Sequence, residues 1–160
     1  MLKRIFQQKE MNITKSGRPA LILIDIQKGF ENIEYWGGQR NNPDAELRAS
    51  ELLKTWRTHH LPIFHIRHCS SIPTSLLHET NAGNEFKDVV APAEGEPITT
   101  RMAGNLGYET FLVADATATF NKKGLDGQNY SAGLIHETAL ASLNKEFATI
   151  VTTDFIKQRI

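Results

Sequence analysis

Residues Pro19 to Asp25 read Pro-Ala-Leu-Ile-Leu-Ile-Asp, a run of apolar side chains that ends in a carboxylate. Because the apolar residues are continuous and do not alternate with polar ones, the run predicts a strand buried on both faces, as in a parallel sheet. Three further apolar runs follow, at residues 61–67, 110–114 and 148–152. With helical patterns between them, the four runs predict an α/β domain with parallel strands.

Two helical patterns separate these strands. The first has Asn42 as its predicted N-cap and Pro43 at the first helical position, and it should end near His59. The second covers about residues 131–145. Its inward-facing side chains should be Ile135, Ala139, Leu140 and Leu143.

The interval between these two helices interrupts the alternation of predicted strands and helices. Residues 70–97 show little periodicity, and only a short helical pattern follows, at residues 99–106. That pattern has Gly104 inside it and is stopped by Gly107. A helix of barely two turns is marginal without tertiary support, which indicates that a segment in front of it is missing.

Composition narrows the possible classes of protein. The 160 residues suit one domain, expected at 18–160 after an N-terminal tail at 1–17. Lysine plus arginine equals aspartate plus glutamate, at 18 each, which argues against nucleic-acid or anionic-membrane partners. The single cysteine, Cys69, excludes an intramolecular disulfide and a zinc–cysteine cluster, and a cytoplasmic setting is predicted.

Candidate chemical groups follow the ends of the predicted strands, where ligands of open parallel sheets bind. Asp25 could orient or deprotonate a nucleophile there, or simply cap the next turn. Tyr35 and Trp36, in the following loop, could line a ligand pocket, or they could pack the loop against the core. Cys69 could be a nucleophile near His68, but the two residues should point to opposite faces, and an inert thiol is favoured.

Two groups later in the chain favour structural roles. Asp115 starts the stretch Asp-Ala-Thr-Ala-Thr-Phe and is expected to bond loop amides. His136 lies on the second helix, where a satisfied histidine is more common than a ligand. No phosphate loop, dinucleotide fingerprint, metal-spaced histidine pair or serine elbow is present, so no cofactor or metal is predicted.

Several stretches, taken together and in order, resemble the isochorismatase-like cysteine hydrolases. They cover most of residues 18–156 and lie at residues 20–30, 35–43, 61–68, 83–97, 101–108, 113–117 and 136–148. The resemblance implies a three-layer α-β-α fold with a Rossmann-like parallel sheet, a small-molecule substrate and a homo-oligomer. Members use an Asp, a Lys and a Cys to cleave C–N or related bonds in small amide-like molecules. The Asp matches Asp25, and the substrate pocket would involve Gln27, Phe30, Tyr35, Trp36 and Cys69.

The chain departs from the family's pattern at one junction, Ile98–Thr99. There the family continues with a Lys-bearing strand, a helix, and a second strand leading to the Cys. Here about 40 residues, roughly one strand–helix–strand unit, are missing together with both catalytic positions. Losing a strand beside the Asp25 strand should expose two strand edges or force a new pairing. We expect either reduced stability or rescue by oligomerisation or by exchange of a segment between chains.

Three interpretations remain open. The chain could be a hydrolase by descent that is catalytically impaired, with Asp25 the only survivor of the catalytic set. It could be a non-catalytic binding or assembly protein that keeps the pocket around Asp25 and Trp36. Least favoured, Cys69 could replace the missing nucleophile.

Overall fold

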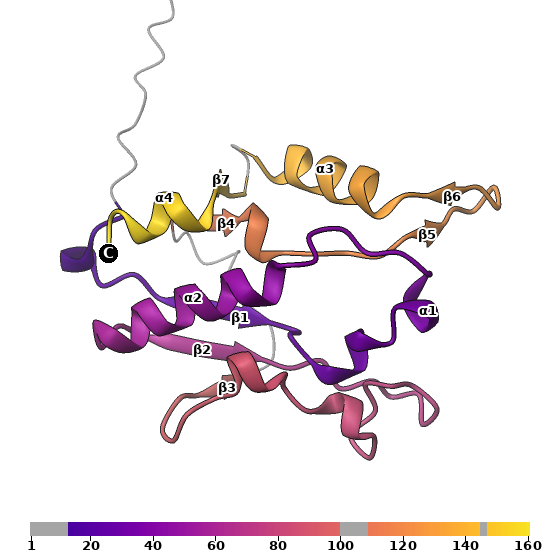
Figure 1. Cartoon of the computed structure of the whole chain (residues 1–160), viewed down its shortest axis with the longest axis horizontal. Coiled ribbons are helices and arrows are strands. Elements are labelled where there is room, and N and C mark those ends of the chain that lie inside the picture. The colour runs from indigo at the N-terminus through magenta and orange to yellow at the C-terminus, as the bar shows by residue number, and fades with distance from the viewer. Residues whose placement is uncertain (1–12, 100–108, 145–146) are drawn as a thin grey trace, which may run out of the picture.

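The computed structural model describes residues 13–99, 109–144 and 147–160 (Figure 1). One parallel sheet has the order β1-β2-β3 and a second pairs β4 with β7, also in parallel. The strands are β1 (Leu21–Ile24), β2 (Ile63–Ile66), β3 (Ile98–Thr99), β4 (Phe111–Val113) and β7 (Thr149–Val151), with a hairpin of β5 (Lys122–Lys123) and β6 (Asn129–Tyr130). The helices are α1 (Ile33–Trp36), α2 (Ala45–Thr58), α3 (Ala132–Leu143) and α4 (Thr153–Lys157). All four strands predicted from apolar runs are confirmed.

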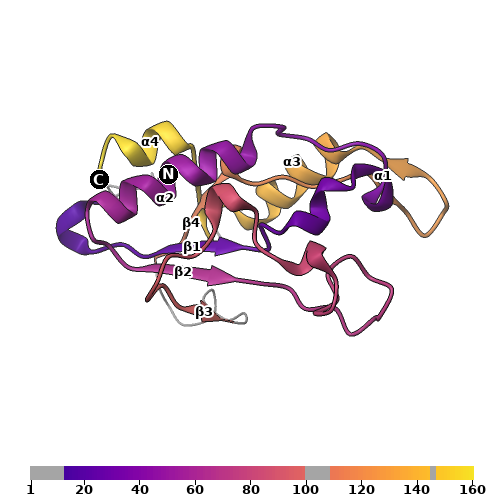
Figure 2. The same cartoon turned by 60° about the horizontal axis from the view of Figure 1, so that its bottom comes forward.

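The sheet is interrupted between β1 and β4. Figures 1 and 2 both place β4 beyond β1 in the order of the strands. Among the described strands, however, β1 pairs only with β2, and β4 pairs only with β7. Within the described residues, the facing edges of β1 and β4 therefore have no strand partner.

Helix α2 joins the two sheets by packing. Its buried stripe of Ala49, Leu52, Leu53 and Trp56 shares one core cluster with Leu21, Leu23 and Ile63 of the first sheet and Val151 of the second. Ile156 of α4 belongs to the same cluster. In Figure 1, α2 lies in front of the interval between β1 and β4. This one helix thus holds the two sheets together by apolar contact, in place of hydrogen bonds between paired strands.

The start of α2 corrects one prediction. Asn42 is not the N-cap, because the helix begins at Ala45 and Asp44 occupies the cap position. Asn42 instead has a positive φ of 44°, a conformation that asparagine tolerates. Its side-chain amide donates to the carbonyls of Ala114 and Thr117, at 3.0 and 2.8 Å. The amide that would have capped the helix therefore ties the loop before α2 to the segment after β4.

Burial on both faces, as predicted, is found in β2, where Ile63 and His65 on one face and Ile66 on the other are buried, but not in β1. In β1, Leu21 and Leu23 are buried against α2, whereas Ile22 is half-buried and Ile24 is 50% exposed. Helix α3 has Ser131 as its N-cap, as the pattern predicted, but only Ala132 is buried. Of the residues expected to face inward, Ile135, Leu140 and Leu143 are half-buried, and Ala139 is exposed.

Two further predictions concern the chain's irregular segments. Ile13, inside the tail predicted at residues 1–17, is buried in the core cluster. The short helix predicted at 99–106 lies outside the described residues except for Thr99, which forms part of β3.

Candidate functional site

Asp25 lies at the carboxyl end of β1, where the sequence placed it. Its backbone N–H donates to the carbonyl of Ile66 at 2.9 Å, and its φ of 57° turns the chain sharply out of the strand. An aspartate accepts this left-handed conformation more readily than most residues. The turn sets the half-buried Asp25 at the carboxyl edge of the sheet.

Gln27 fastens the Asp25 loop to the segment after β2. The side chain is 0% exposed. Its Nε2 donates to the carbonyls of His68 and Asn84 at 3.0 and 2.9 Å, and its Oε1 accepts from the N–H of His68 at 2.9 Å. Because the amide is buried and bonded to backbone, Gln27 positions the loop in this structure and does not lie open to a substrate, contrary to the role expected from the resemblance.

Phe30 and Trp36 form an aromatic cluster with Phe120. The ring centroids of Phe30 and Trp36 are 4.8 Å apart, and those of Phe30 and Phe120 are 6.0 Å apart. The indole N–H of Trp36 donates to the carbonyl of Gly29 at 2.8 Å. Tyr35 meets Trp36 edge to face at 4.9 Å and is 51% exposed. Trp36 therefore packs the loop, while Tyr35 is the ring that faces solvent.

Phe120 is a member of this cluster that the sequence did not single out. It ends the Asp115 stretch, on the loop that follows β4, so its strand also delivers it to the carboxyl edge. A backbone bridge pairs it with Arg40, whose guanidinium carbon lies 6.0 Å from the Phe120 ring centroid. The usable signal was its position after a strand end, which is the same signal that identified Trp36.

Cys69 is exposed and lies beside an amide. Its Sγ is 3.7 Å from Nδ2 and 3.9 Å from Oδ1 of Asn84. No histidine ring contacts the thiol among the hydrogen bonds of the described residues, and nearby His65 is bonded to Glu96. The arrangement agrees with an inert thiol, since nucleophilic cysteines need a base or cation beside them.

The ammonium groups nearest this loop are already paired. Lys28 lies 2.8 Å from Glu85 and 3.2 Å from Asp88. Lys87, whose N–H donates to the carbonyl of Ile26, places its Nζ 2.8 Å from Glu46 Oε1. Arg40 reaches the same oxygen at 2.8 Å. Neither lysine is therefore placed like a free activating group for a thiol.

Glu46 is held as a carboxylate by these cations. Burial works against the charged form, but the hydrogen bonds from Lys87 and Arg40 prevail and lower the pKa of the Glu46 carboxyl below its ordinary value. Two cations share one acid here, which secures the start of α2 to the loops around Asp25.

Asp115 and His136 have the structural roles that the sequence favoured. Asp115 Oδ1 accepts from the N–H of Thr153 at 2.8 Å and from its hydroxyl at 3.1 Å, which joins the end of β4 to α4. His136 Nε2 lies 3.1 Å from the hydroxyl of Thr117. In the described part of the chain, no group of three or more His, Cys, Asp or Glu side chains is placed to hold a metal ion. No helix there is long and apolar enough to cross a membrane.

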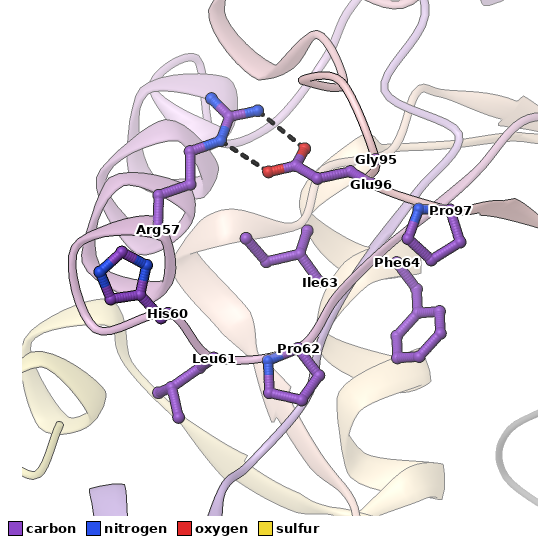
Figure 3. Close-up of a pocket in the computed structure, with 9 residues that line it drawn as sticks. All are labelled: Arg57, His60, Leu61, Pro62, Ile63, Phe64, Gly95, Glu96 and Pro97. Atoms are coloured by element: carbon purple, nitrogen blue, oxygen red, sulfur yellow. Dashed lines mark hydrogen bonds and ion pairs between the residues drawn. The ribbon is translucent and has the colours of Figure 1, made fainter.

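A cavity of about 410 Å³ opens at the opposite edge of the sheet, at the amino end of β2 (Figure 3). Pro62 and Ile63 line it from the start of the strand, and Pro97 lines it from just before β3. Arg57 and Glu96 face each other across its rim, joined by two hydrogen bonds of 2.8 and 2.9 Å. Asp25 is not among the lining residues, so this cavity is separate from the carboxyl-edge site.

Glu96 is the centre of a polar cluster beside this cavity. Besides Arg57, the carboxylate accepts from the N–H of Ala93 at 2.9 Å and from Nε2 of buried His65 at 2.8 Å. The pKa of the Glu96 carboxyl falls from 4.5 to about 2, mainly because of the hydrogen bonds from Arg57. The hydrogen bonds from Ala93 and His65 lower it further. The cluster connects α2, β2 and the segment leading to β3.

Replacing Glu96 by Gln should destabilise the chain by about 2 kcal/mol at pH 7, less than the pKa difference alone implies because Arg57 is partly exposed. Because the pKa of Glu96 is lower in the folded state, its carboxylate stabilises the fold above pH 4.5. This stabilisation is lost as the pH falls towards 2 and the carboxylate becomes protonated. Urea unfolding at several pH values should therefore show the two proteins converging below about pH 4. A constant difference down to pH 2 would contradict this account.

Several known proteins similar to this chain are named as members of the isochorismatase family. The isochorismatase family protein YrdC of Bacillus subtilis (strain 168) is 35% identical over 176 residues, covering 86% of this chain and 93% of that protein. A crystal structure of an isochorismatase-family protein from Chromobacterium violaceum superposes with a TM-score of 0.81 at 28% identity, covering 88% of this chain and 92% of that one. A cysteine hydrolase from Pseudomonas syringae pv. phaseolicola shares the fold, with a TM-score of 0.72 at 16% identity and coverage of 89% and 92%. No protein-family model matches the chain.

The length of the alignment to the Bacillus protein bears on the missing segment. It runs over 176 residues, although this chain has only 160, and 86% of 160 is about 138. The difference between 176 and 138, about 38 positions, has no counterpart in this chain. That number agrees with the strand–helix–strand unit that the sequence indicated was absent.

Proposed function

The chain belongs to the isochorismatase family of hydrolases, and we propose that it descends from an amide-cleaving member but is catalytically impaired. The observation that carries the proposal is that the chain's one cysteine is Cys69. Its thiol lies against the amide of Asn84, on a segment tied down by Gln27. Among the described strands, β1 also has no pairing partner on its edge away from β2.

The chemistry explains why one surviving residue is not enough. In the family's mechanism a thiolate attacks the carbonyl carbon of a small amide, an Asp acts as general base and a Lys helps to activate the thiol. Without the thiolate, Asp25 could only assist attack by water. General-base assistance alone contributes about 10²- to 10⁴-fold, far below the rate enhancement of a complete enzyme.

A second candidate function is ligand binding without turnover. It is favoured by the intact aromatic cluster of Phe30, Trp36 and Phe120, with the exposed ring of Tyr35 beside it. Stacked rings at a strand's carboxyl edge can hold a flat, amide-like molecule without any nucleophile. The third interpretation, with Cys69 as nucleophile, has no supporting contact in the described residues.

The proposal is tested with a panel of small amides, including nicotinamide, assayed with the purified chain and with Asp25→Asn and Cys69→Ser. Asparagine keeps the left-handed backbone of residue 25 and removes the base. All three proteins are expected to show no more than about 10⁴-fold acceleration over the uncatalysed rate. Turnover at the rate of a complete enzyme that disappears in Asp25→Asn would overturn the impaired assignment. Loss in Cys69→Ser would instead establish the substitute nucleophile.

Quenching of tryptophan fluorescence by a panel compound, without hydrolysis, would favour the binding function. Trp36→Phe is the matched control, because Trp56 is buried in the core and should not respond. A signal that persists in Trp36→Phe would exclude the aromatic cluster as its source.

A further inference from the structure

A second cavity, of about 440 Å³, lies beside helix α1 and just before the start of α2. Five residues line it: Ile33, Gly38, Gln39, Arg40 and Pro43. Neither Asp25 nor Trp36 is among these lining residues, so the cavity is separate from the candidate site at the end of β1. Arg40 is the one charged residue of the five, whereas Ile33 and Pro43 are apolar. The cavity therefore combines an apolar wall with a guanidinium.

The guanidinium of Arg40 has donors that the protein does not use. The side chain is 16% exposed, and its Nη2 lies 2.8 Å from Glu46 Oε1. Among the hydrogen bonds of the described residues, its Nε and Nη1 have no partner. These two nitrogens are not sealed in the core, because His65 Nδ1 is the one buried side-chain nitrogen or oxygen without a partner in the described part of the chain. Since a guanidinium presents five N–H donors in a planar fork, Arg40 can bind a second carboxylate.

The charges around Arg40 leave it only partly neutralised. Glu46 Oε1 also accepts from Lys87 Nζ at 2.8 Å, so one carboxylate serves two cations and one positive charge remains in excess. The side chains of Lys87 and Glu46 are only 14% and 16% exposed, so water screens this cluster less than it screens a surface pair. Glu34, whose Oε2 approaches Gly38, opposes this charge, but Glu34 is exposed and its field is screened more strongly.

We propose that this cavity binds a small organic carboxylate, whose charged group pairs with Arg40 and whose apolar body packs on Ile33 and Pro43. Such a ligand would supply the negative charge that the cluster around Arg40 lacks. The cavity at the amino end of β2 does not offer the same chemistry, because its Arg57 is already paired with Glu96 by two hydrogen bonds (Figure 3). The site does not depend on the proposed function, since none of its residues belongs to the catalytic set.

Benzoate is a probe with this chemistry, because it carries one carboxylate on a flat apolar ring. An NMR titration of the backbone amides is expected to give a Kd on the order of 1 mM, with the largest shifts at Gly38, Gln39 and Arg40. Benzyl alcohol, which keeps the ring and lacks the charge, should bind at least about tenfold more weakly. Trp36→Phe should leave benzoate binding unchanged, which separates this site from the aromatic cluster of the second candidate function.

Three substitutions should move the benzoate affinity in opposite directions. Arg40→Gln should weaken binding at least about tenfold and Lys87→Gln about fivefold, because each removes positive charge. Glu46→Gln should tighten binding about fivefold, because it removes the carboxylate that competes for Arg40. Arg48→Gln is the matched control, since Arg48 is 39% exposed, pairs with Glu51 and does not line the cavity. Its affinity should stay within about twofold of the parent chain, because water screens an exposed charge.

Circular dichroism checks that each variant is folded, and the titration of the parent chain decides the matter if one is not. If the cluster only stabilises the fold, Lys87→Gln and Glu46→Gln should both weaken binding or both leave it unchanged. That result would overturn the proposal. So would shifts confined to residues outside the cavity, or no saturable binding of benzoate below about 50 mM.

Discussion

Insertion of the missing segment between Ile98 and Thr99 is expected to convert this chain into an active amide hydrolase. The insert would be the portion of the Bacillus YrdC protein that has no counterpart here, which is about 38 residues long. By the family's pattern, the insert should add a strand between β1 and β4, which do not pair among the described strands, and bring a Cys and a Lys to the neighbourhood of Asp25. Replacing a lost catalytic set should raise kcat/KM by on the order of 10⁴-fold or more.

The same insertion should raise the thermal midpoint by on the order of 10 °C, because it closes two strand edges and buries apolar surface. Turnover of the amide panel and a calorimetric scan measure the two effects separately. Two matched controls share the insert: one with its Cys changed to Ala, and one with Asp25→Asn. Both should keep the raised midpoint and lose the activity. An insert that folds and stabilises the protein but hydrolyses nothing would contradict the proposed descent from an amide-cleaving enzyme.

Leu52→Ala should have the largest effect on stability of any single substitution considered. Leu52 is 2% exposed at the centre of α2 and lies in the cluster that joins both sheets. Removing its side chain leaves a cavity, which costs about 3–5 kcal/mol in well-packed cores. Because no hydrogen-bonded ladder joins β1 to β4 among the described strands, the helix has few other elements to share its role.

Urea unfolding followed by circular dichroism measures this loss. Total stabilities of natural domains are about 5–15 kcal/mol, so Leu52→Ala should shift the transition to much lower urea and could leave the chain partly unfolded without denaturant. Leu47→Ala is the matched control, since Leu47 lies on the same helix but is 58% exposed, and its change should stay within about 0.5 kcal/mol. Equal losses for the two variants would show that α2 does not join the sheets.

Local sequence patterns were enough to predict the strands and the helix that hold the fold together. The apolar runs at β1, β2, β4 and β7 predicted strands because each buries at least one face, and the Leu52, Leu53 and Trp56 stripe predicted α2 because its spacing matches the helical repeat. The position of Asp25 followed from the same reasoning, since a strand's carboxyl end is readable from the sequence that precedes it.

Residues with several possible hydrogen-bond partners were harder to interpret. Asn42 could cap a helix or bind distant backbone, and only the fold brings Ala114 and Thr117, more than 70 positions away, within 3.0 Å of its amide. The Gln27 side chain could bind a ligand or the protein's own backbone. Only the fold brings the carbonyls of His68 and Asn84 close enough to bond it. Phe120 joined the aromatic cluster for the same reason, because its partners come from another strand's loop.

By itself, the sequence determined the family, the strands and the single cysteine, and it predicted the junction where a segment is missing, because these depend on the order and spacing of residues along the chain. The tertiary structure decided how the two sheets are held together. Among the described residues β1 and β4 do not pair, and α2 packs against both sheets through one buried face. Burial and exposure depend on which elements meet in space, and no local pattern of residues contains that information.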